Sequence, residues 1–317
     1  MTFDGVVARI DLRGVVVLDD GGTLRAVAVP KRLQDPGARL GNAIVVGDSV
    51  RVREEVVESI APRRNRFERR AAGARARARH QILAANLSQV VAVASLAHPP
   101  LAEGLLDRFA VTAEWCGLPL VLVFTKCDLV SEAEIADASA LYARTGYPTH
   151  AVVAKEGRGL AELRTVLAGR RSLVVGHSGV GKSTLLNALV PGLDLRIGEV
   201  NAKTGRGRHT TTASTLVRLD PGPPATEVID TPGVRTFGLP PDLPARSLAQ
   251  LFPEWRDQGP CRFADCSHLD EPGCALVAMR AEGAFGGERH RSYRVLYEEL
   301  SGAPERRLPR GAKGRAR

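Results

Sequence analysis

Aromatic residues are scarce in this chain, and cysteines and long apolar runs are also few. Phe, Trp and Tyr make up 4% of the 317 residues, which argues against a large base-stacking platform of the RRM type without excluding single stacking residues. The five cysteines are odd in number and three lie close together, unlike a disulfide framework. No apolar run reaches the roughly 18 residues of a membrane span. With no secretory signal visible either, we expect a cytoplasmic protein.

Positive charge is abundant instead. The formal net charge is +9, the isoelectric point is about 9.7, and most of the basic residues are arginines. Arginine pairs with phosphates through two hydrogen bonds at once, so this charge predicts a polyanionic partner. Genomic base composition explains part of the preference for arginine over lysine, but not the net charge. With 44% hydrophobic residues, the chain is long enough for two or three folded domains.

Residues 1–62 have the pattern of a small β-domain. Short β-branched runs alternate with turn residues at Gly5–Ile10, Gly14–Leu18, Leu24–Val29, Ala43–Val46 and Ser49–Arg53, with a hairpin-type turn at Asp19–Gly22. Closely spaced strands of this kind predict a barrel, with the OB-fold as the leading candidate. Such barrels often bind oligonucleotides, which favours nucleic-acid contact over a β-domain with no binding role.

A basic linker is expected over residues 63–80, where arginine recurs after Pro62. Such a run is usually a solvated, mobile linker. Arginine runs also pair with RNA phosphates, and some become ordered only on binding. Both interpretations can hold together.

Residues 81–240 change to the alternating pattern of an α/β domain. Buried-strand runs at 89–94, 118–124, 150–153 and 171–175 are separated by helical periodicity at 101–116, at 131–144 and from about 159, and a helix over 182–189 follows the last strand. This alternation predicts a mainly parallel, doubly wound sheet.

The glycine-rich loop after the last of these strands carries the strongest motif. Gly176, Gly181, Lys182 and Ser183 fit the phosphate-loop pattern G-x-x-x-x-G-K-S, and the strand–loop–helix context disfavours a chance match. In such loops backbone N–H groups surround the phosphates, the lysine reaches the β- and γ-phosphates, and the serine holds Mg²⁺. We expect a nucleoside triphosphate to contact Gly176, His177, Ser178, Gly179, Val180, Gly181, Lys182, Ser183 and Thr184.

Two later segments supply further candidates for magnesium and γ-phosphate contacts. Asp230 ends a strand run, where such enzymes place a magnesium partner, and Gly233 offers a backbone amide to the γ-phosphate. The basic, glycine-rich segment 205–212 lies between the phosphate loop and Asp230. Of its three consecutive threonines, Thr211 is our candidate for completing the magnesium shell.

The base is expected to be guanine. Thr125, Lys126 and Asp128 follow a buried strand and resemble the guanine-recognition motif Asn-Lys-x-Asp, whose aspartate accepts two hydrogen bonds that adenine cannot offer. Thr125 in place of asparagine predicts the loss of a loop-bridging hydrogen bond worth about 1 kcal/mol. Ala154 and Lys155, after the next strand, form a second candidate guanine loop. The alternative is a lysine and an aspartate at the surface with no role.

A cluster of metal-ligand residues lies near the C-terminus, at Cys261, Cys266, His268 and Cys274. Thiolates and a neutral imidazole suit tetrahedral Zn²⁺, and four protein ligands make a closed structural site. A redox or iron–sulfur site is the alternative. Cys116 and Cys127 are isolated and are expected to be packing residues. We expect residues 241–317 to be a mostly helical zinc domain whose basic tail is either a disordered end or an rRNA arm.

The order of the motifs is unusual, because the guanine motif precedes the phosphate loop, as if the ends of an ordinary GTPase were joined and the chain cut elsewhere. With Gly207–Thr212, Asp230–Arg235 and the cysteine cluster, this order resembles the ribosome small-subunit-dependent GTPase A family. These circularly permuted GTPases assist late maturation of the bacterial small ribosomal subunit. The resemblance covers the whole chain and implies GTP, GDP, Mg²⁺ and Zn²⁺ as ligands, and the subunit and its rRNA as partners. We expect a monomer.

The resemblance also implies slow intrinsic hydrolysis that the subunit stimulates. Val234 stands where Ras-like enzymes carry a glutamine that positions water, and a valine cannot do so. His209 is our candidate for the polar group that a partner positions, beside the catalytic candidates Lys182 and Thr211. The alternative for His209 is a solvent-facing loop histidine.

Two other functions are compatible with a phosphate loop. Asp128 and the permuted order oppose a P-loop ATPase or nucleotide kinase. An RNA-binding module with a vestigial nucleotide site is opposed by the intact Lys182, Ser183 and Asp230. The step from RNA to the ribosome rests on the resemblance.

Overall fold

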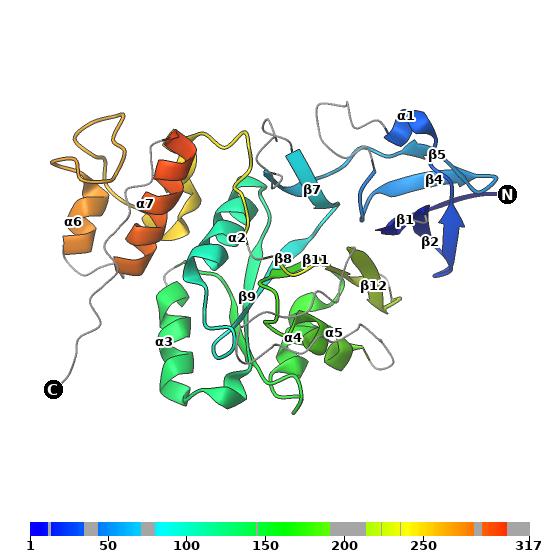
Figure 1. Cartoon of the computed structure of the whole chain (residues 1–317), viewed down its shortest axis with the longest axis horizontal. Coiled ribbons are helices and arrows are strands. Elements are labelled where there is room, and N and C mark those ends of the chain that lie inside the picture. Colours follow the sequence, from blue (N-terminus) through cyan, green and yellow to red (C-terminus); the bar gives the residue numbers. More distant parts are fainter. Residues whose placement is uncertain are drawn as a thin grey trace. The chain divides into compact units, whose positions relative to one another are not determined.

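The computed structural model describes residues 1–11, 14–34, 44–70, 80–143, 145–190, 214–222, 224–234, 236–281 and 287–302 (Figure 1). The chain divides into two units, the first comprising residues 1–242 with 251–254 and the second residues 243–250 with 255–317. Within the described ranges, none of the helices combines the length and the apolar character that a membrane crossing requires.

The N-terminal strands pair into a closed ring. They are β1 (Thr2–Asp11), β2 (Gly14–Asp19), β3 (Leu24–Val27), β4 (Ser49–Arg53) and β5 (Val56–Ile60), with the short helix α1 (Lys31–Gln34) after β3. β1 pairs with β2 and β4, β2 with β3, and β4 with β5, all antiparallel. A parallel bridge between Ala28 and Val56 joins the end of β3 to β5. Alternate valines such as Val7, Val17 and Val52 point inward and are fully buried.

The expected strand at Ala43–Val46 is wrong for the part that the structure describes. Residues 44–48 form a turn, in which the Val45 N–H donates to Asp48 Oδ2 (2.9 Å) and the Asp48 N–H donates to the Val45 carbonyl (3.2 Å). A side-chain carboxylate that accepts a local N–H competes with strand pairing, so an apolar run becomes a turn. The turn expected at Asp19–Gly22 is confirmed by a hydrogen bond from the Gly22 N–H to the Asp19 carbonyl (2.9 Å).

The arginine-rich segment is not linker throughout. β6 (Arg66–Arg70) pairs antiparallel with β7 (His80–Ala85) in a separate two-stranded sheet. Phe67 on β6 is fully buried, and its ring centroid lies 5.8 Å from that of Phe237. This aromatic contact gives the strand an apolar anchor among its basic residues. The arginines between 71 and 79 lie outside the described residues.

The central sheet is mainly parallel, which confirms the predicted α/β domain. Its strands are β8 (Gln89–Ser95), β9 (Leu120–Thr125), β10 (Thr149–Val152), β11 (Arg171–Gly176), β12 (Thr215–Asp220) and β13 (Thr226–Asp230). Strands β10, β9, β8, β11 and β13 lie in that order and run parallel. β12 was not predicted; it is antiparallel to β13 and also pairs with β1 of the N-terminal ring.

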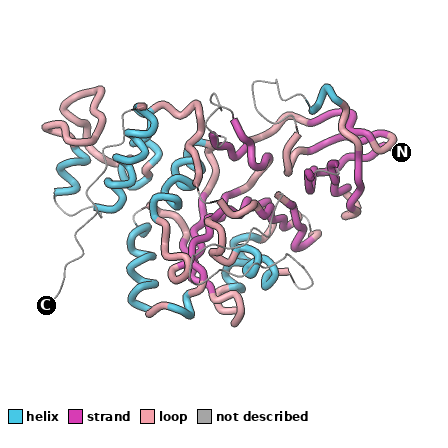
Figure 2. Tube along the Cα trace, viewed as in Figure 1, coloured by secondary structure: helices cyan, strands magenta, loops and turns pink. Residues whose placement is uncertain are grey.

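Helices cover both faces of this sheet, as a doubly wound fold requires (Figure 2). α2 (Glu103–Trp115) and α3 (Glu132–Ala143) pack on one face, and α4 (Leu160–Leu167) and α5 (Lys182–Leu189) on the other. Neighbouring strand residues divide between the two cores, with Val90 in the α2 core and Val91 in the α4 core. This alternation explains why the buried strands read as unbroken apolar runs.

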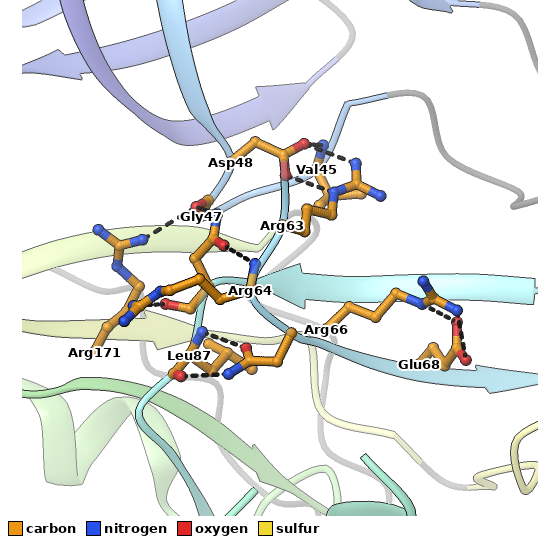
Figure 3. A network of polar contacts seen from close by, with 11 residues as sticks. Val45, Gly47, Asp48, Arg63, Arg64, Arg66, Glu68, Leu87 and Arg171 are labelled. Carbon is orange, nitrogen blue, oxygen red and sulfur yellow. Dashed lines mark hydrogen bonds and ion pairs between the residues drawn. The ribbon is translucent and has the colours of Figure 1, made fainter. Parts of the chain in front are cut away.

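A polar network joins the N-terminal ring to the central sheet (Figure 3). Asp48 is fully buried and accepts hydrogen bonds from Arg63 Nε (2.6 Å) and Nη2 (2.8 Å). The Gly47 carbonyl accepts hydrogen bonds from Arg171 at the start of β11 (3.1 Å) and from Asn86 (3.0 Å). The strand that leads into the phosphate loop is therefore bonded to the ring at its other end.

The second unit is built from short helices. They are the helices α6 (Ala275–Ala281) and α7 (Gly287–Ser301) and most of the 3₁₀ segment η2 (Ala245–Leu251), whereas the 3₁₀ segment η3 (Pro253–Trp255) contributes only Trp255. Trp255 packs edge-on against Tyr293 of α7, with ring centroids 4.8 Å apart, and both side chains are buried. The predicted helix at Tyr293–Leu300 is confirmed as part of α7.

Candidate functional site

The expected nucleotide-contacting motifs gather at one edge of the central sheet. The pairing places Gly176 of β11 opposite Val93 of β8, and Thr125 of β9 opposite both Ser95 and Val152. Asp230 of β13 lies opposite Val174. Because these strands are parallel, their carboxyl ends meet at the same edge, which is where ligands bind in open α/β sheets.

The phosphate loop has backbone geometry that its glycines permit. Gly179 and Gly181 adopt positive φ angles of 82° and 95°, in a region that side chains disfavour. At Gly176, a Cβ atom would lie 2.4 Å from the Val93 carbonyl oxygen, so a larger residue would force strand and loop apart. The motif spacing therefore produces a tight loop between β11 and α5 that can surround phosphate oxygens.

Lys182 is held at the mouth of this loop. Its side chain is 7% exposed, and Nζ donates to the carbonyls of Gly176 and His177, both at 3.1 Å. Burial lowers the pKa of Lys182 to about 8, although nearby Asp230 acts in the opposite direction. A Cβ atom at Gly233 would lie 3.0 Å from this Nζ. The lysine and Gly233 thus converge, as expected for two groups that meet one terminal phosphate.

The segment after β13 is fixed against the phosphate loop. The Val234 N–H donates to the Gly176 carbonyl (3.2 Å), and Val234 bridges to His177 as in a parallel sheet. The Thr231 hydroxyl donates to the Val174 carbonyl (2.7 Å). Fully buried Asp230 is therefore anchored on the strand next to β11, near the start of α5, where Ser183 and Thr184 are partly exposed.

Thr125 corrects one prediction. The loop-bridging hydrogen bond that we expected to be lost is present, because the Thr125 hydroxyl lies 2.5 Å from the Val180 carbonyl oxygen and 3.1 Å from that of Ala94. Thr125 is 3% exposed. A hydroxyl carries one proton, and the Val180 carbonyl oxygen, at the shorter distance, is the better placed of the two acceptors. The threonine therefore links the guanine motif directly to the phosphate loop.

Lys126 makes a second link between the same two loops. It adopts a left-handed backbone conformation with φ of 57°, and its Nζ donates to the Gly179 carbonyl (2.9 Å) and to the His98 carbonyl. Burial lowers the pKa of Lys126, nearby Lys155 lowers it further, and Asp128 opposes both. Lys155 and Asp128 both act electrostatically on Lys126, so both lie near it. The two candidate guanine loops therefore meet at Lys126.

The remaining guanine-site candidates lie on exposed turns. Asp128 belongs to the short 3₁₀ segment η1 (Cys127–Leu129) and is exposed, as is Lys155, while Ala154 is partly buried after β10. Exposure leaves the Asp128 carboxylate accessible to a base. The switch candidates His209 and Thr211 lie outside the described residues.

The four metal-ligand candidates of the second unit come together. One ligand atom from each of Cys261, Cys266, His268 and Cys274 lies within 4.8 Å of all the others. His268 Nδ1 is 3.4 Å from Cys261 Sγ and 3.6 Å from Cys274 Sγ, and these two sulfurs are 4.0 Å apart. Tetrahedral zinc, with bonds of about 2.3 Å to sulfur and about 2.1 Å to nitrogen, needs similar separations. The residues therefore fit a zinc ion, with Nδ1 as the imidazole ligand.

Two side chains that the sequence analysis missed support this cluster. The Glu271 carboxylate accepts hydrogen bonds from the N–H groups of Ser267 (2.8 Å) and Leu269 (3.0 Å). Burial acts to raise the pKa of Glu271, but the hydrogen bonds from Ser267 and the neighbouring backbone outweigh it and lower the pKa to about 2. Tyr293 donates to the Ser267 carbonyl (2.8 Å). The available signal was weak: Glu271 is one of three acidic residues between Cys261 and Cys274, and groups of this kind can orient metal ligands from outside.

Comparison with known proteins gives one consistent family. The model of the RsgA GTPase family matches residues 60–240. A protein of Chlorobaculum parvum described as "Small ribosomal subunit biogenesis GTPase RsgA" is 38% identical over 312 residues, covering 94% of this chain and 98% of the relative. A protein of Azotobacter vinelandii with the same description is 42% identical over 222 residues, covering 69% of this chain and 63% of the relative.

Solved structures show the same similarity. The crystal structure of YjeQ from Thermotoga maritima aligns with a TM-score of 0.71 and 30% identity, covering 95% of this chain and 99% of that one. The structure of YloQ, described as a circularly permuted GTPase, aligns with a TM-score of 0.65 over 96% of this chain and 97% of its own. At 24% identity, the YloQ comparison supports the fold alone.

Proposed function

The chain belongs to the RsgA GTPase family and is a GTP hydrolase, and we propose that it binds the small ribosomal subunit and assists its late maturation, with hydrolysis stimulated by the subunit. The observation that carries this proposal is the direct bonding of the guanine motif to the phosphate loop, through Thr125 to Val180 and Lys126 to Gly179. One site thus combines base selection with triphosphate binding. The descriptions of the relatives supply the ribosomal partner.

The family implies GTP, GDP and Mg²⁺ as ligands, and we assign roles to the residues at the sheet edge. Thr125, Lys126, Asp128, Ala154 and Lys155 form the guanine side of the site, and residues 176–184 form the phosphate side. Magnesium is held by Ser183, Thr211 and Asp230, directly or through water. Gly233 contacts the γ-phosphate through its N–H group.

We further propose that the flanking parts of the chain bind RNA and zinc. The pairing order of the N-terminal strands, closed by the Ala28–Val56 bridge, supports an OB-fold over residues 1–62. The basic segment 63–80, which contains β6, and the permuted GTPase domain 81–240 follow. The ligand separations among the three cysteines and His268 support one structural zinc ion in a domain over 241–317, which metal analysis of the purified chain would detect.

His209 is the proposed catalytic partner of the subunit-stimulated reaction. Val234 packs against the apolar core and bonds to the phosphate loop through its backbone, so its side chain cannot orient water. His209→Ala is expected to abolish subunit-stimulated turnover while leaving GTP binding intact. Phosphate release and nucleotide titration of the same preparation measure both. Normal stimulated turnover in the variant would remove His209 from this role.

Co-sedimentation with purified small subunits tests the partner. We expect the chain to pellet with the subunits when a non-hydrolysable GTP analogue is bound, and less with GDP. Raising the salt concentration is expected to weaken pelleting steeply, because arginine–phosphate contacts release counterions. Large ribosomal subunits, which are equally rich in RNA phosphates, are the matched control. Equal pelleting with both subunits would reduce the interaction to general RNA affinity.

A further inference from the structure

A cavity of about 700 Å³ opens beside the cysteine cluster, entirely within the second unit. Its walls come from η2, Trp255 of η3, the segment that carries the zinc-ligand candidates Cys261, Cys266 and His268, and the start of α6. The side chains that matter for its chemistry are Gln250, Trp255, Arg256, Gln258, Arg262 and Phe263. A volume of this size lies in the range of about 300–1,000 Å³ that is typical of small-ligand sites.

The charge of the cavity favours an anionic ligand. None of the described side chains that line it is a carboxylate, whereas two arginines, Arg256 and Arg262, are among them. Among the described residues, no acidic side chain forms an ion pair with Arg262. The amides of Gln250 and Gln258 offer both donors and acceptors. The lining thus combines positive charge with groups able to bond to a heterocyclic edge.

Phe263 gives the cavity an exposed aromatic face. Its side chain is 43% exposed, and the Arg262 guanidinium carbon lies 5.4 Å from its ring centroid. Arg262 is itself held in place, because its N–H donates to the Gly273 carbonyl (3.0 Å) and its stem packs where a side chain at position 273 would be. Gly273 also has a positive φ of 76°. The arginine–aromatic pair is therefore preorganised before any ligand arrives.

We propose that this cavity binds one unpaired nucleotide of a single-stranded RNA, with the base stacked on Phe263 and the phosphate contacted by Arg262 and Arg256. Single-stranded RNA is recognised by stacking on exposed aromatic rings and by arginine contacts to phosphates, with polar groups at the base edges. An acidic peptide would use the arginines but would leave the ring without a planar partner. The inference rests on the proposed function and specifies which RNA structure this part of the chain recognises.

Binding of a short fluorescent oligouridine to the full-length protein tests the proposal. Phe263→Ala is expected to weaken binding by about tenfold, the usual effect of losing one base–aromatic stack. Phe263→Tyr keeps the ring and is expected to bind like the parent. Val295→Ala is the matched control, because Val295 is an apolar side chain of α7 in the same unit with similar exposure, 42%. Zinc content and GDP affinity, measured on each variant, confirm that the fold is intact.

Two further measurements locate the site and identify its ligand. Arg262→Ala is expected to lower the salt dependence of binding by about one released counterion, and an oligouridine containing photoreactive thiouridine is expected to crosslink to the peptide that contains Phe263. Crosslinks found only elsewhere, or equal affinity of the parent and Phe263→Ala, would overturn the proposal. If an acidic peptide displaced the RNA, and did so only when Phe263 was present, the proposal would be overturned and the partner would be an acidic segment of a protein.

The nucleotide pocket and the proposed ribosomal function can fail independently of each other. Failure of the oligouridine test with intact subunit-stimulated hydrolysis would reject the nucleotide pocket alone. Conversely, Phe263-dependent RNA binding without subunit-stimulated hydrolysis would retain the pocket and reject the ribosomal assignment.

Discussion

At the scale of single residues, Thr125 shows how one hydroxyl can couple two recognition loops. It connects strand β9 to a carbonyl 55 positions further along the chain. A residue of the proposed guanine motif therefore also bonds to the loop that is proposed to bind the phosphates. From the sequence, threonine at this position was expected to lose a hydrogen bond that asparagine makes. Comparison of motifs cannot show which distant carbonyl the shorter side chain reaches.

Replacing Thr125 tests this coupling. Thr125→Val removes the hydroxyl but keeps the shape, leaving the buried Val180 carbonyl without its donor at a cost of about 1–3 kcal/mol. We expect GDP binding to weaken by about tenfold, and binding of inorganic triphosphate, which has no base, to weaken as well. Thr125→Ser retains the hydroxyl and should bind both ligands like the parent in isothermal titration. If Thr125→Val weakened GDP but not triphosphate, the hydroxyl would act on the base alone.

Lys182 is expected to make nucleotide affinity depend on pH. Burial lowers its pKa to about 8 in the nucleotide-free protein, and a triphosphate favours the charged form. Below this pH the ammonium is already protonated, whereas above it binding requires uptake of a proton. GTP affinity should therefore be constant below pH 8 and fall by up to about tenfold per unit above it. Titrations should stay below the pH at which guanine itself ionises.

Lys182→Arg is the control for this profile. Arginine remains charged across the range, so the variant should bind more weakly but without the decline above pH 8. A flat profile for the parent protein, or the same decline in Lys182→Arg, would contradict the assignment of the pH dependence to Lys182.

At the scale of elements, the sequence predicted best where local pattern and tertiary role agree. The parallel strands were predicted from their apolar runs, because they are buried on both faces. The helix α5 was predicted because it follows the glycine-rich motif directly. β6 was missed because Phe67, which anchors the strand in the core, is its one apolar residue and stands among charged neighbours. The apolar segment at 43–46 was wrongly predicted as a strand because the carboxylate of Asp48, which lies outside the segment, accepts the hydrogen bond of the Val45 N–H.

The same Asp48 is predicted to fix the turn at residues 44–48 to the segment that follows β5. Its fully buried carboxylate pairs with Arg63, whose side chain is 18% exposed. Asp48→Ala removes the buried carboxylate that pairs with Arg63 and should lower the free energy of unfolding by about 3 kcal/mol. The matched control is Asp4→Ala, which breaks an exposed ion pair with Arg51 and should cause no measurable change. Urea unfolding followed by circular dichroism compares the two, and equal stability would contradict the proposed role of Asp48.

In the molecule as a whole, the permuted order of the motifs places the candidate switch segments next to the flanking regions along the chain. The segment of the candidate switch residues leads into β12, whose Thr215 pairs with Arg9 of the N-terminal ring. The segment after β13, which bonds to the phosphate loop through Val234, continues toward the second unit. The candidate switch segment is thus connected to the N-terminal ring through the β12–β1 pairing, and the segment after β13 is connected along the chain to the second unit. The sequence indicated this order of motifs, but the β1–β12 pairing is visible only in the structure.

We propose that the turnover of GTP by this chain depends on the small ribosomal subunit. The decisive experiment measures multiple-turnover release of phosphate from GTP with and without purified small subunits. The chain alone should release phosphate slowly, small subunits should stimulate the release strongly, large subunits should stimulate it little, and ATP should not be turned over. Release that is equally slow with and without small subunits, from a preparation that binds GTP, would contradict this proposal.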